Sequence, residues 1–178
     1  MSALQPAVAR LGCHPAWPCA AVRLLEVRAS PAAPGSLRLT YTLHADLASL
    51  RLPAQLPAPR RSDELWRHTC FEAFVAGASG AAYREFNFSP SLAWAAYEFT
   101  GYREGMRPLE DAVPLLDVRL AADTLVLDAT LATGCPRGRL ALAAVLEASD
   151  GTLSYWALRH PGPRPDFHHP EGFQLEFS

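Results

Sequence analysis

Three glutamates recur in three consecutive short segments of the chain. Glu72, Glu85 and Glu98 each lie where apolar and polar residues alternate, which is the pattern of a β-strand. If the segments pair about Gly77–Gly80 and about Ser91-Leu92, the three carboxylates form one row across neighbouring strands. Like charges directly opposite one another destabilise a sheet. We therefore expect the row to be compensated by arginine, by a bound cation or by the hydroxyl groups of a sugar.

The same register places further polar residues on the face of the glutamates and makes the other face aromatic and core-like. A tryptophan ring stacks on the C–H face of a sugar, while asparagine and carboxylate groups bond its hydroxyls. The candidate ligand-binding residues are Trp66, His68, Glu72, Glu85, Asn87, Trp94 and Glu98. The alternative is a solvated face on which the glutamates pair with Arg23, Arg38, Arg84 or Arg159.

Paired carboxylates also occur in glycosidases. The predicted row, however, lies on a sheet face with no obvious cleft. Ser89-Pro90-Ser91 also lacks the glycines that flank a nucleophile elbow. The sequence therefore favours a binding role over a catalytic one and predicts no catalytic residue, without excluding an enzyme.

Two clusters have the composition of metal ligands. The run Asp166-Phe167-His168-His169 is one, and its alternative interpretation is a loop whose histidines bond backbone carbonyls at the open end of the fold. Cys13-His14 with Cys19 is the other, but no second pair follows at the spacing of a zinc site. Cysteines packed as small apolar side chains are the favoured interpretation, so we expect no metal.

Composition narrows the possible partners. The chain has 178 residues and a net charge of −2, whereas a general nucleic-acid binder carries a basic excess. It contains no lysine, which excludes Schiff-base chemistry and a lysine-type phosphate loop. No stretch resembles a secretory signal or reaches the roughly 18 apolar residues of a membrane span. We expect a cytoplasmic protein that binds neither nucleic acid nor membrane.

The elements that position these residues are predicted to be short strands. Sixteen prolines and eleven glycines divide the chain into short runs, most of which alternate with period two. The predicted strands are Val22–Ala29, Ser36–Leu43, His68–Val75, Tyr83–Ser89, Trp94–Gly101, Leu115–Leu120, Leu125–Leu131, Leu140–Glu147, Leu153–Arg159 and Phe173–Phe177. About ten strands without helices predict an all-β, two-sheet antiparallel β-sandwich, immunoglobulin-like or jelly-roll-like, over residues 1–178 as a single domain.

Three connections have distinct signatures. Asp150-Gly151 is the strongest hairpin signal. Leu52–Arg61 contains three prolines and two arginines and is predicted to be a surface loop. Arg159–Gly172 contains four prolines and three histidines and is predicted to be a long ordered crossing or a lid.

Four stretches together resemble a bacterial DOMON-like domain, a group similar in turn to the family-nine carbohydrate-binding modules. They are Leu65–Phe74, Tyr83–Ser91, Trp94–Tyr97 and Gly101–Met106. The first corresponds to the family's strand LW-x-x-x-x-x-E-x-F and the second to Y-x-F-x-x-x-P. The resemblance extends to His14-Pro15, Pro18-Cys19, Asp46-Leu47, Tyr155–Leu158 and Pro165–Pro170, and so covers essentially the whole chain.

The resemblance implies a β-sandwich of a kind that binds sugars or haem. The sugar-binding modules hold their ligand between two tryptophans, and Trp66 and Trp94 lie in the matching region. In haem-binding relatives a methionine and a histidine or lysine ligate iron, which here implies Met106 with His160, His168 or His169. We expect a non-catalytic sandwich for a small carbohydrate-like molecule, without a cofactor. The alternatives are a protein-interaction or structural module and a haem-binding domain.

Overall fold

The computed structural model describes residues 7–178, and it contains strands and three short 3-10 helices. The strands of the first sheet are β1 (Ala7–Arg10), β3 (Val22–Ala33), β4 (Ser36–Ala45), β10 (Leu115–Leu120) and β11 (Thr124–Ala132). Those of the second are β2 (Gly12–Cys13), β5 (Arg60–Arg61), β6 (Cys70–Gly77), β7 (Tyr83–Phe88), β8 (Ala93–Phe99), β9 (Arg107–Pro108), β12 (Gly138–Glu147), β13 (Leu153–Ala157) and β14 (Leu175–Phe177). The 3-10 helices are η1 (Leu47–Ser49), η2 (Leu65–Arg67) and η3 (Pro170–Gly172).

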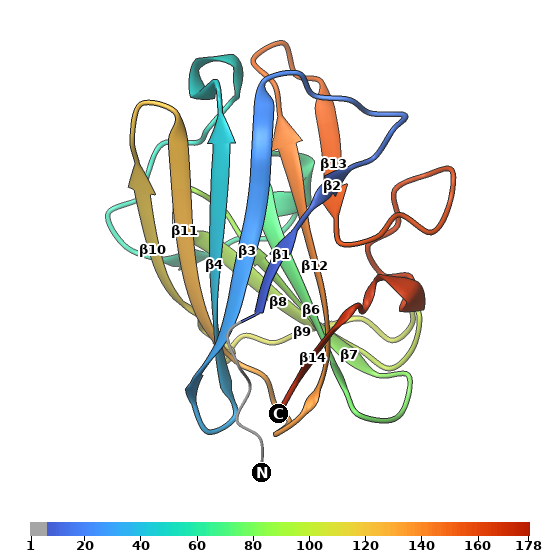
Figure 1. The fold of residues 1–178 in the computed structure, drawn as a ribbon. Coiled ribbons are helices and arrows are strands. Elements are labelled where there is room, and N and C mark those ends of the chain that lie inside the picture. Colours follow the sequence, from blue (N-terminus) through green and yellow to red (C-terminus); the bar gives the residue numbers. More distant parts are fainter. Residues whose placement is uncertain (1–6) are drawn as a thin grey trace.

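The two sheets pack face to face, as Figure 1 shows. The five-stranded sheet has the order β1-β3-β4-β11-β10, and the nine-stranded sheet follows the order β2-β13-β12-β6-β7-β8-β5. Strand β14 adds to β12 and β9 adds to β8. All pairs are antiparallel except β5 with β8. The predicted two-sheet sandwich is confirmed, although residues 1–6 of the predicted domain lie outside the described residues.

All ten predicted strands are present, with ends that differ by a few residues. The strands that the sequence did not reveal are β1, β2, β5 and β9, each of two to four residues. Strand β5 takes the last two residues of the predicted loop Leu52–Arg61. The predicted hairpin at Asp150-Gly151 joins β12 to β13, and Gly151 has φ +89°, which glycine adopts readily.

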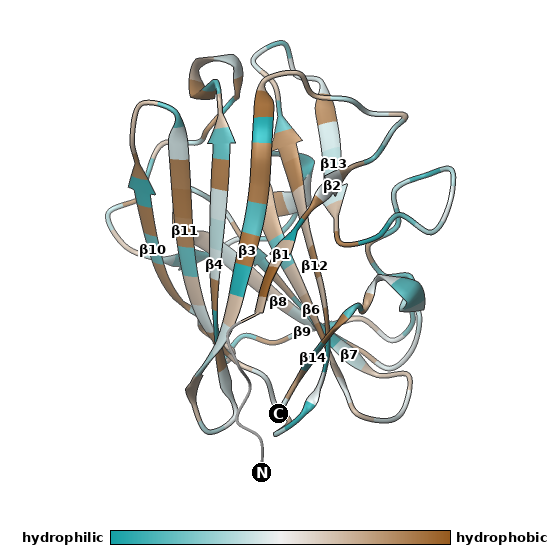
Figure 2. Cartoon of the chain, viewed as in Figure 1, coloured by the Kyte–Doolittle hydropathy of each residue, from teal (hydrophilic) through white to brown (hydrophobic). Residues whose placement is uncertain are grey.

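The main core lies between the sheets. Strands β3, β4 and β11 alternate between buried and more exposed residues, so the five-stranded sheet presents one apolar face. Figure 2 shows the alternation as changing colours along these strands. Among the fully buried side chains are Leu25, Leu39, Tyr41 and Leu127 from this sheet and Phe71, Phe86 and Phe88 from the other. This core fixes the inner face of β6 and β7.

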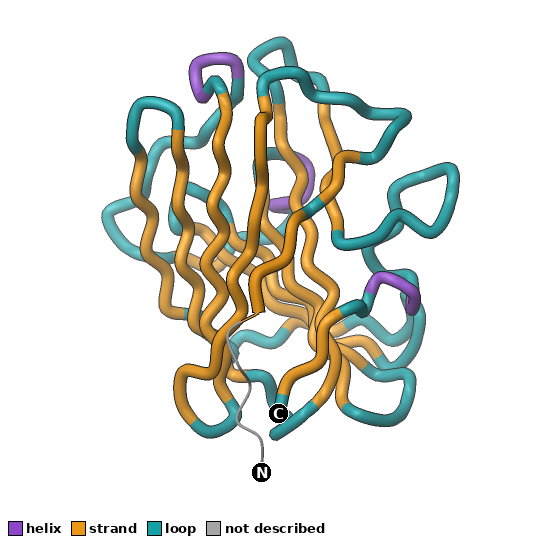
Figure 3. Tube along the Cα trace, in the orientation of Figure 1, coloured by secondary structure: helices purple, strands orange, loops and turns teal. Residues whose placement is uncertain are grey.

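The nine-stranded sheet is buried on its outer face too. A second apolar cluster on that face includes Phe74, Tyr83, Tyr97 and Phe99, with Phe167 packed against it. Phe167 belongs to residues 159–172, which we call the lid; Figure 3 shows this segment as a loop interrupted by η3 at the right of the view. The predicted crossing or lid therefore covers part of this sheet.

The structure corrects the predicted strand register. In the β6–β7 pair Phe71 lies opposite Phe88 instead of Phe86, a shift of two residues that leaves each side chain on its predicted face. In the β7–β8 pair Phe88 lies opposite Trp94 instead of Ala95, a shift of one residue that reverses the faces of β8. The cause is a three-residue turn between Ser89 and Ala93, in which Leu92 has a left-handed φ of 74°.

This shift makes the predicted row of three glutamates wrong. Glu72 and Glu85 share the outer face, but Glu98 lies opposite Arg84 on the inner side of the sheet. Trp94 moves into the main core, where its side chain is only 4% exposed. Trp94, a candidate ligand-binding residue, therefore does not share a ligand surface with Trp66.

Candidate functional site

A cavity of about 310 Å³ lies on the outer face of the nine-stranded sheet. Glu72 on β6, Glu85 on β7 and Val145 on β12 form its floor. Its sides come from η2, from β13 and from Arg103 in the loop after β8, and its cover comes from the lid. The fold therefore brings together seven elements and loops at this cavity.

The floor contains carboxyl groups that are almost fully buried. Glu72 is 3% exposed and Glu85 is 5% exposed. Asn87, which lies opposite Glu72 in the β6–β7 pair, donates its Nδ2–H to Glu85 Oε1 at 2.7 Å. Within residues 7–178, neither Glu72 Oε1 nor Asn87 Oδ1 has a hydrogen-bond partner. A buried polar atom without a partner costs roughly 1–3 kcal/mol, so these two oxygens are sites for a donor supplied from outside the chain.

Burial controls the protonation of the floor. Desolvation raises the pKa of Glu72 well above its ordinary value, and repulsion from Glu85 raises it further. Desolvation also raises the pKa of Glu85 to about 7, against smaller lowering effects of the Asn87 hydrogen bond and the Arg103 charge. The two carboxyls therefore retain at least part of a shared proton at neutral pH.

His168 links the lid to this floor. Its Nδ1 lies 2.8 Å from the Tyr83 hydroxyl oxygen, which itself accepts a hydrogen bond from the Arg103 backbone N–H at 3.2 Å. The other ring nitrogen, Nε2, lies 3.7 Å from Glu85 Oε2. Desolvation and the Arg103 charge lower the pKa of His168 to about 4, so the ring is neutral at pH 7.

Aromatic rings lie beside the acidic floor. Trp66 is 38% exposed and meets Tyr97 edge to face, with ring centroids 6.3 Å apart. Tyr155 and Phe167 contact each other on the β13 side, with centroids 6.2 Å apart. These rings provide flat apolar surfaces beside the acidic floor.

Two arginines line the cavity, and each has an acidic partner away from the floor. Arg67 donates to Glu64 at 2.9 Å, and Arg103 donates to Asp166 at 2.8 Å. Asp166 also accepts the Tyr102 hydroxyl hydrogen at 2.5 Å and so anchors the lid to the loop after β8. The arginine charges are thus largely balanced outside the floor.

The structure brings together part of the predicted site. Trp66, Glu72 and Glu85 line the cavity, and Asn87 lies behind them, bonded to Glu85. Trp94 is in the core. The other two predicted residues have partners elsewhere: His68 meets Glu147 at 2.7 Å, and Glu98 pairs with Arg84 and Arg107.

The residues predicted for haem or metal do not form one site. Met106 is 59% exposed, His160 lies 2.8 Å from the Gly12 carbonyl oxygen, and His169 Nδ1 accepts from the Glu171 N–H in η3. His168 is the only one of the four that lines the cavity. A methionine–histidine pair for haem does not fit this cavity, and no group of three or more histidine, cysteine or acidic residues in the described chain is arranged to hold a metal ion.

Several site residues were not predicted. Arg103, Tyr155, Phe167 and Asp166 come from loops and strands far from β6 and β7 in sequence. Phe167 and Asp166 belong to the run that the sequence marked as a possible loop over the end of the fold. Tyr155 lies in a predicted strand, but its place next to β12 depends on sheet order, which local patterns do not specify.

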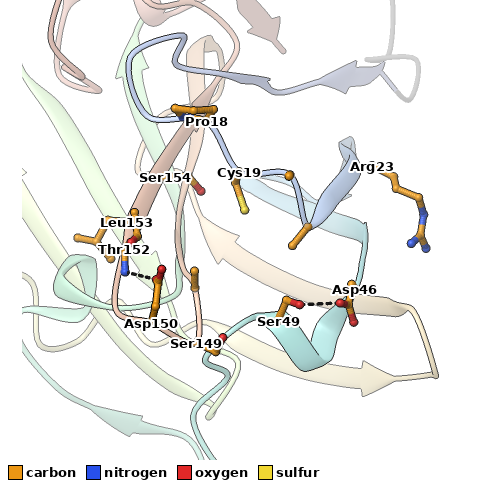
Figure 4. Close-up of a pocket in the computed structure, with 13 residues that line it drawn as sticks. Pro18, Cys19, Arg23, Asp46, Ser49, Ser149, Asp150, Thr152, Leu153 and Ser154 are labelled. Carbon is orange, nitrogen blue, oxygen red and sulfur yellow. Dashed lines mark hydrogen bonds between the residues drawn. The ribbon is translucent and has the colours of Figure 1, made fainter.

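A larger depression of about 690 Å³ lies at the end of the sandwich where β3 begins and β12 turns into β13. Figure 4 shows its lining spread over turns and loop ends. Its polar groups bond one another: Ser49 donates to Asp46 at 2.6 Å, and the Thr152 backbone N–H donates to Asp150 at 2.8 Å. Since those groups already have partners, the smaller cavity is the better candidate.

Comparison with known proteins finds a solved structure with the same fold. No family model matches the chain, and no curated protein matches it. The crystal structure of a proposed carbohydrate-binding protein from Bacteroides uniformis ATCC 8492, at 2.70 Å resolution, has the same fold with a TM-score of 0.72. The match covers 97% of this chain and 87% of that chain at 14% identity. The class defined by fold and site is therefore a β-sandwich with a lidded cavity on one sheet, and the DOMON-like resemblance stays a prediction.

No helix among residues 7–178 has the length and apolar character that crossing a bilayer requires.

Proposed function

We propose that this chain is a single-domain, non-catalytic binding protein whose lidded cavity holds a carbohydrate-like ligand. The observation that carries the proposal is the buried, unpartnered oxygen Glu72 Oε1 at the floor of a cavity that also exposes Trp66, with the unpartnered Asn87 Oδ1 behind that floor. Sugar hydroxyls supply donors for such oxygens, and the C–H face of a sugar ring packs on an indole. The shared fold with a proposed carbohydrate-binding protein supports the same class of ligand.

The protein-interaction alternative depended on a surface beside Trp66 and Trp94. Because Trp94 is buried in the main core, the two tryptophans do not form one exposed patch. The carbohydrate proposal does not need Trp94, since its platform is Trp66 with Tyr155 and Phe167.

Calorimetric titration with a panel of soluble mono- and oligosaccharides tests the proposal. We expect at least one sugar to bind and Trp66→Ala to weaken that binding by about tenfold or more, because the stacking surface is lost. Met106→Ala, which removes an exposed side chain outside the cavity, is the matched control and should leave the affinity unchanged. The proposal fails if no sugar binds or if Trp66→Ala has no effect on the binding that is found.

A further inference from the structure

Apart from the proton that Glu72 and Glu85 share, the polar side-chain atoms at the floor of the cavity are hydrogen-bond acceptors. Within residues 7–178, Glu72 Oε1 and Asn87 Oδ1 are unpartnered, and Glu85 Oε2 lies 3.7 Å from the His168 ring. The donor group of Asn87 is already used, because its Nδ2–H bonds Glu85. A ligand group that fits this floor must therefore bring several donors, and an ammonium group brings three donors and no acceptor.

The charges around the cavity also favour an ammonium group. The cavity contains two acidic and two basic side chains, but Arg67 and Arg103 are held by Glu64 and Asp166, away from the floor. His168, the nearest titratable side chain of the lid, is neutral at pH 7. Glu72 and Glu85 are thus buried without a cation at hydrogen-bonding distance, and burying carboxylates is unfavourable unless a positive charge accompanies them.

The walls suit a cation as well. Trp66, Tyr155 and Phe167 line the same cavity, and the faces of aromatic rings attract cations, most strongly where water is excluded. Neutral sugars also stack on such rings. The combination of rings with a buried acidic floor that has no ionic partner favours an amine over a hydroxyl.

We propose that the ligand is an amino sugar whose free, protonated amine sits on Glu72 and Glu85. The inference rests on the proposed function, because it names the class of sugar for the same cavity. The ammonium group donates to Glu72 Oε1 and to Glu85, and the sugar ring packs on Trp66. Asn87 lies behind the pair and holds Glu85 in place through its Nδ2–H.

Binding of the amine is linked to a proton. The ammonium charge favours the ionised form of the two carboxyls, so the proton that they share at neutral pH leaves the protein on binding. The titratable or charged groups around the pair include the cavity-lining Arg67 and Tyr155, and Tyr41, whose hydroxyl donates to the Glu72 carbonyl oxygen. The others are Cys70, Tyr83, Tyr97, Arg103, Asp166 and His168. The pKa values of Tyr41, Cys70, Tyr83, Tyr97 and Arg103 are raised and those of Asp166 and His168 are lowered, so none of these seven lies between 5 and 8.

Calorimetry with matched sugars tests the inference. The probes are amine and neutral sugars in pairs of gluco, galacto and manno configuration, together with N-acetylated forms that keep the size of the amine derivative without its charge. We expect one amine sugar to bind at least about tenfold more tightly than its neutral and N-acetylated partners at pH 7. Repeating the titration in buffers of different ionisation enthalpy should show protons released by the protein.

Variants of the two glutamates test whether the amine binds at the floor of the cavity. Glu72→Gln keeps the shape of the side chain and should reduce the preference for the amine sugar over its neutral partner toward one. The readout is the ratio of the two affinities, both measured on the same variant. Glu85→Gln gives the same readout if Glu72→Gln does not fold. Glu98→Gln, on the other side of the sheet, is the control and should keep the full preference.

The outcomes separate the two proposals. If neutral sugars bind as tightly as their amine partners, or if both Gln variants keep the amine preference, the amino-sugar inference is wrong and the carbohydrate function stands. If no sugar of either kind binds, the proposed function itself is wrong.

Discussion

Glu72 and Glu85 are buried where desolvation favours the neutral carboxyl, and that preference links folding to pH at the scale of single residues. A group whose pKa is higher in the folded protein than in the unfolded chain binds more protons when folded. Its stabilisation is complete below the unfolded pKa and is lost as the pH rises through the folded pKa. For Glu85 the window runs from the ordinary value of 4.5 to about 7.

Glu85→Gln should therefore remove part of the pH dependence of stability. In the wild type, the Glu85 carboxyl alone lowers the free energy of unfolding by about 3 kcal/mol between pH 4.5 and 7. Urea unfolding at intervals of half a pH unit measures the slope, which should be flatter in the variant. Glu98→Gln is the control, because ion pairing with Arg107 lowers the pKa of Glu98 out of this window. Equal slopes in wild type and Glu85→Gln would contradict the assignment.

His168 affects the pH dependence of the free energy of unfolding with the opposite sign. Its pKa is lowered to about 4 in the folded protein, so the unfolded chain takes up the proton first as the pH falls below the ordinary value of 6.5. The stabilisation from neutral His168 is present above pH 6.5 and lost toward pH 4. In the same urea series, His168→Gln should make the decline of stability from pH 4.5 to 6.5 steeper than in the wild type, and a flatter curve would contradict this.

At the scale of elements, the sequence predicted strands well and their register poorly. Alternating residues and turn-forming residues mark the ten predicted strands, while strands of two residues such as β2 and β5 are too short to show a pattern. Register is fixed where only one face of a strand is buried, because a slip of one residue then exposes the apolar set. Strand β8 is buried on both faces, so a shift of one residue still buries its apolar side chains and the sequence pattern does not specify the register. The turn that contains Leu92 determines the pairing instead.

That difference explains which site residues the sequence found. Glu72, Glu85 and Asn87 lie on β6 and β7, whose predicted faces survive because the error in their pairing is an even number of residues. Trp94 and Glu98 lie on β8, whose faces are reversed by the odd shift. The lid residues depend on tertiary contacts with Tyr83, Tyr102 and Arg103 that no local pattern encodes.

The attachment of the lid depends on Asp166. Asp166→Asn weakens the bonds from Tyr102 and Arg103, and we expect a loss of about 1 to 3 kcal/mol in local stability together with faster amide exchange over residues 164–168. Hydrogen exchange read by mass spectrometry measures it. Glu171→Gln in the same segment is the control, because its ion pair with Arg159 is half exposed on both sides and contributes little. Similar exchange in both variants would show that Asp166 does not anchor the lid.

The β6–β12 pair depends on a close approach at Gly138. A Cβ atom there would lie 2.0 Å from the Ala76 carbonyl oxygen, so Gly138→Ala must move the backbone of one strand. We expect a loss of at least about 2 kcal/mol in the free energy of unfolding. Gly12→Ala is the matched control, because its nearest contact is 3.9 Å away, and its stability should stay within about 1 kcal/mol of the wild type. Denaturant unfolding of both variants makes the comparison, and equal losses would contradict it.

At the scale of the whole molecule, both sheets join distant parts of the chain. Strand β4 pairs with β11, β6 with β12, and β2 with β13. Proteins dominated by such non-local pairs fold in roughly milliseconds to seconds. We therefore expect refolding, followed by stopped-flow fluorescence of the buried Trp94 and Trp156, to lie in that range. Complete refolding within microseconds would contradict the assigned topology.

The pairing of β6 with β12 also has a consequence during synthesis on the ribosome. Cys70 pairs with Val145, so about 75 residues must be added before the apolar edge of β6 meets its partner. At about 5–20 residues per second, that edge waits for roughly 4–15 s. Strands β6, β7 and β8 carry eight of the 17 aromatic residues of the chain, and an unpaired edge of such strands is a template for association with other chains. The strands that build the candidate site are thus also the ones most exposed to aggregation in a nascent chain, and chaperone demand should be greatest in this interval.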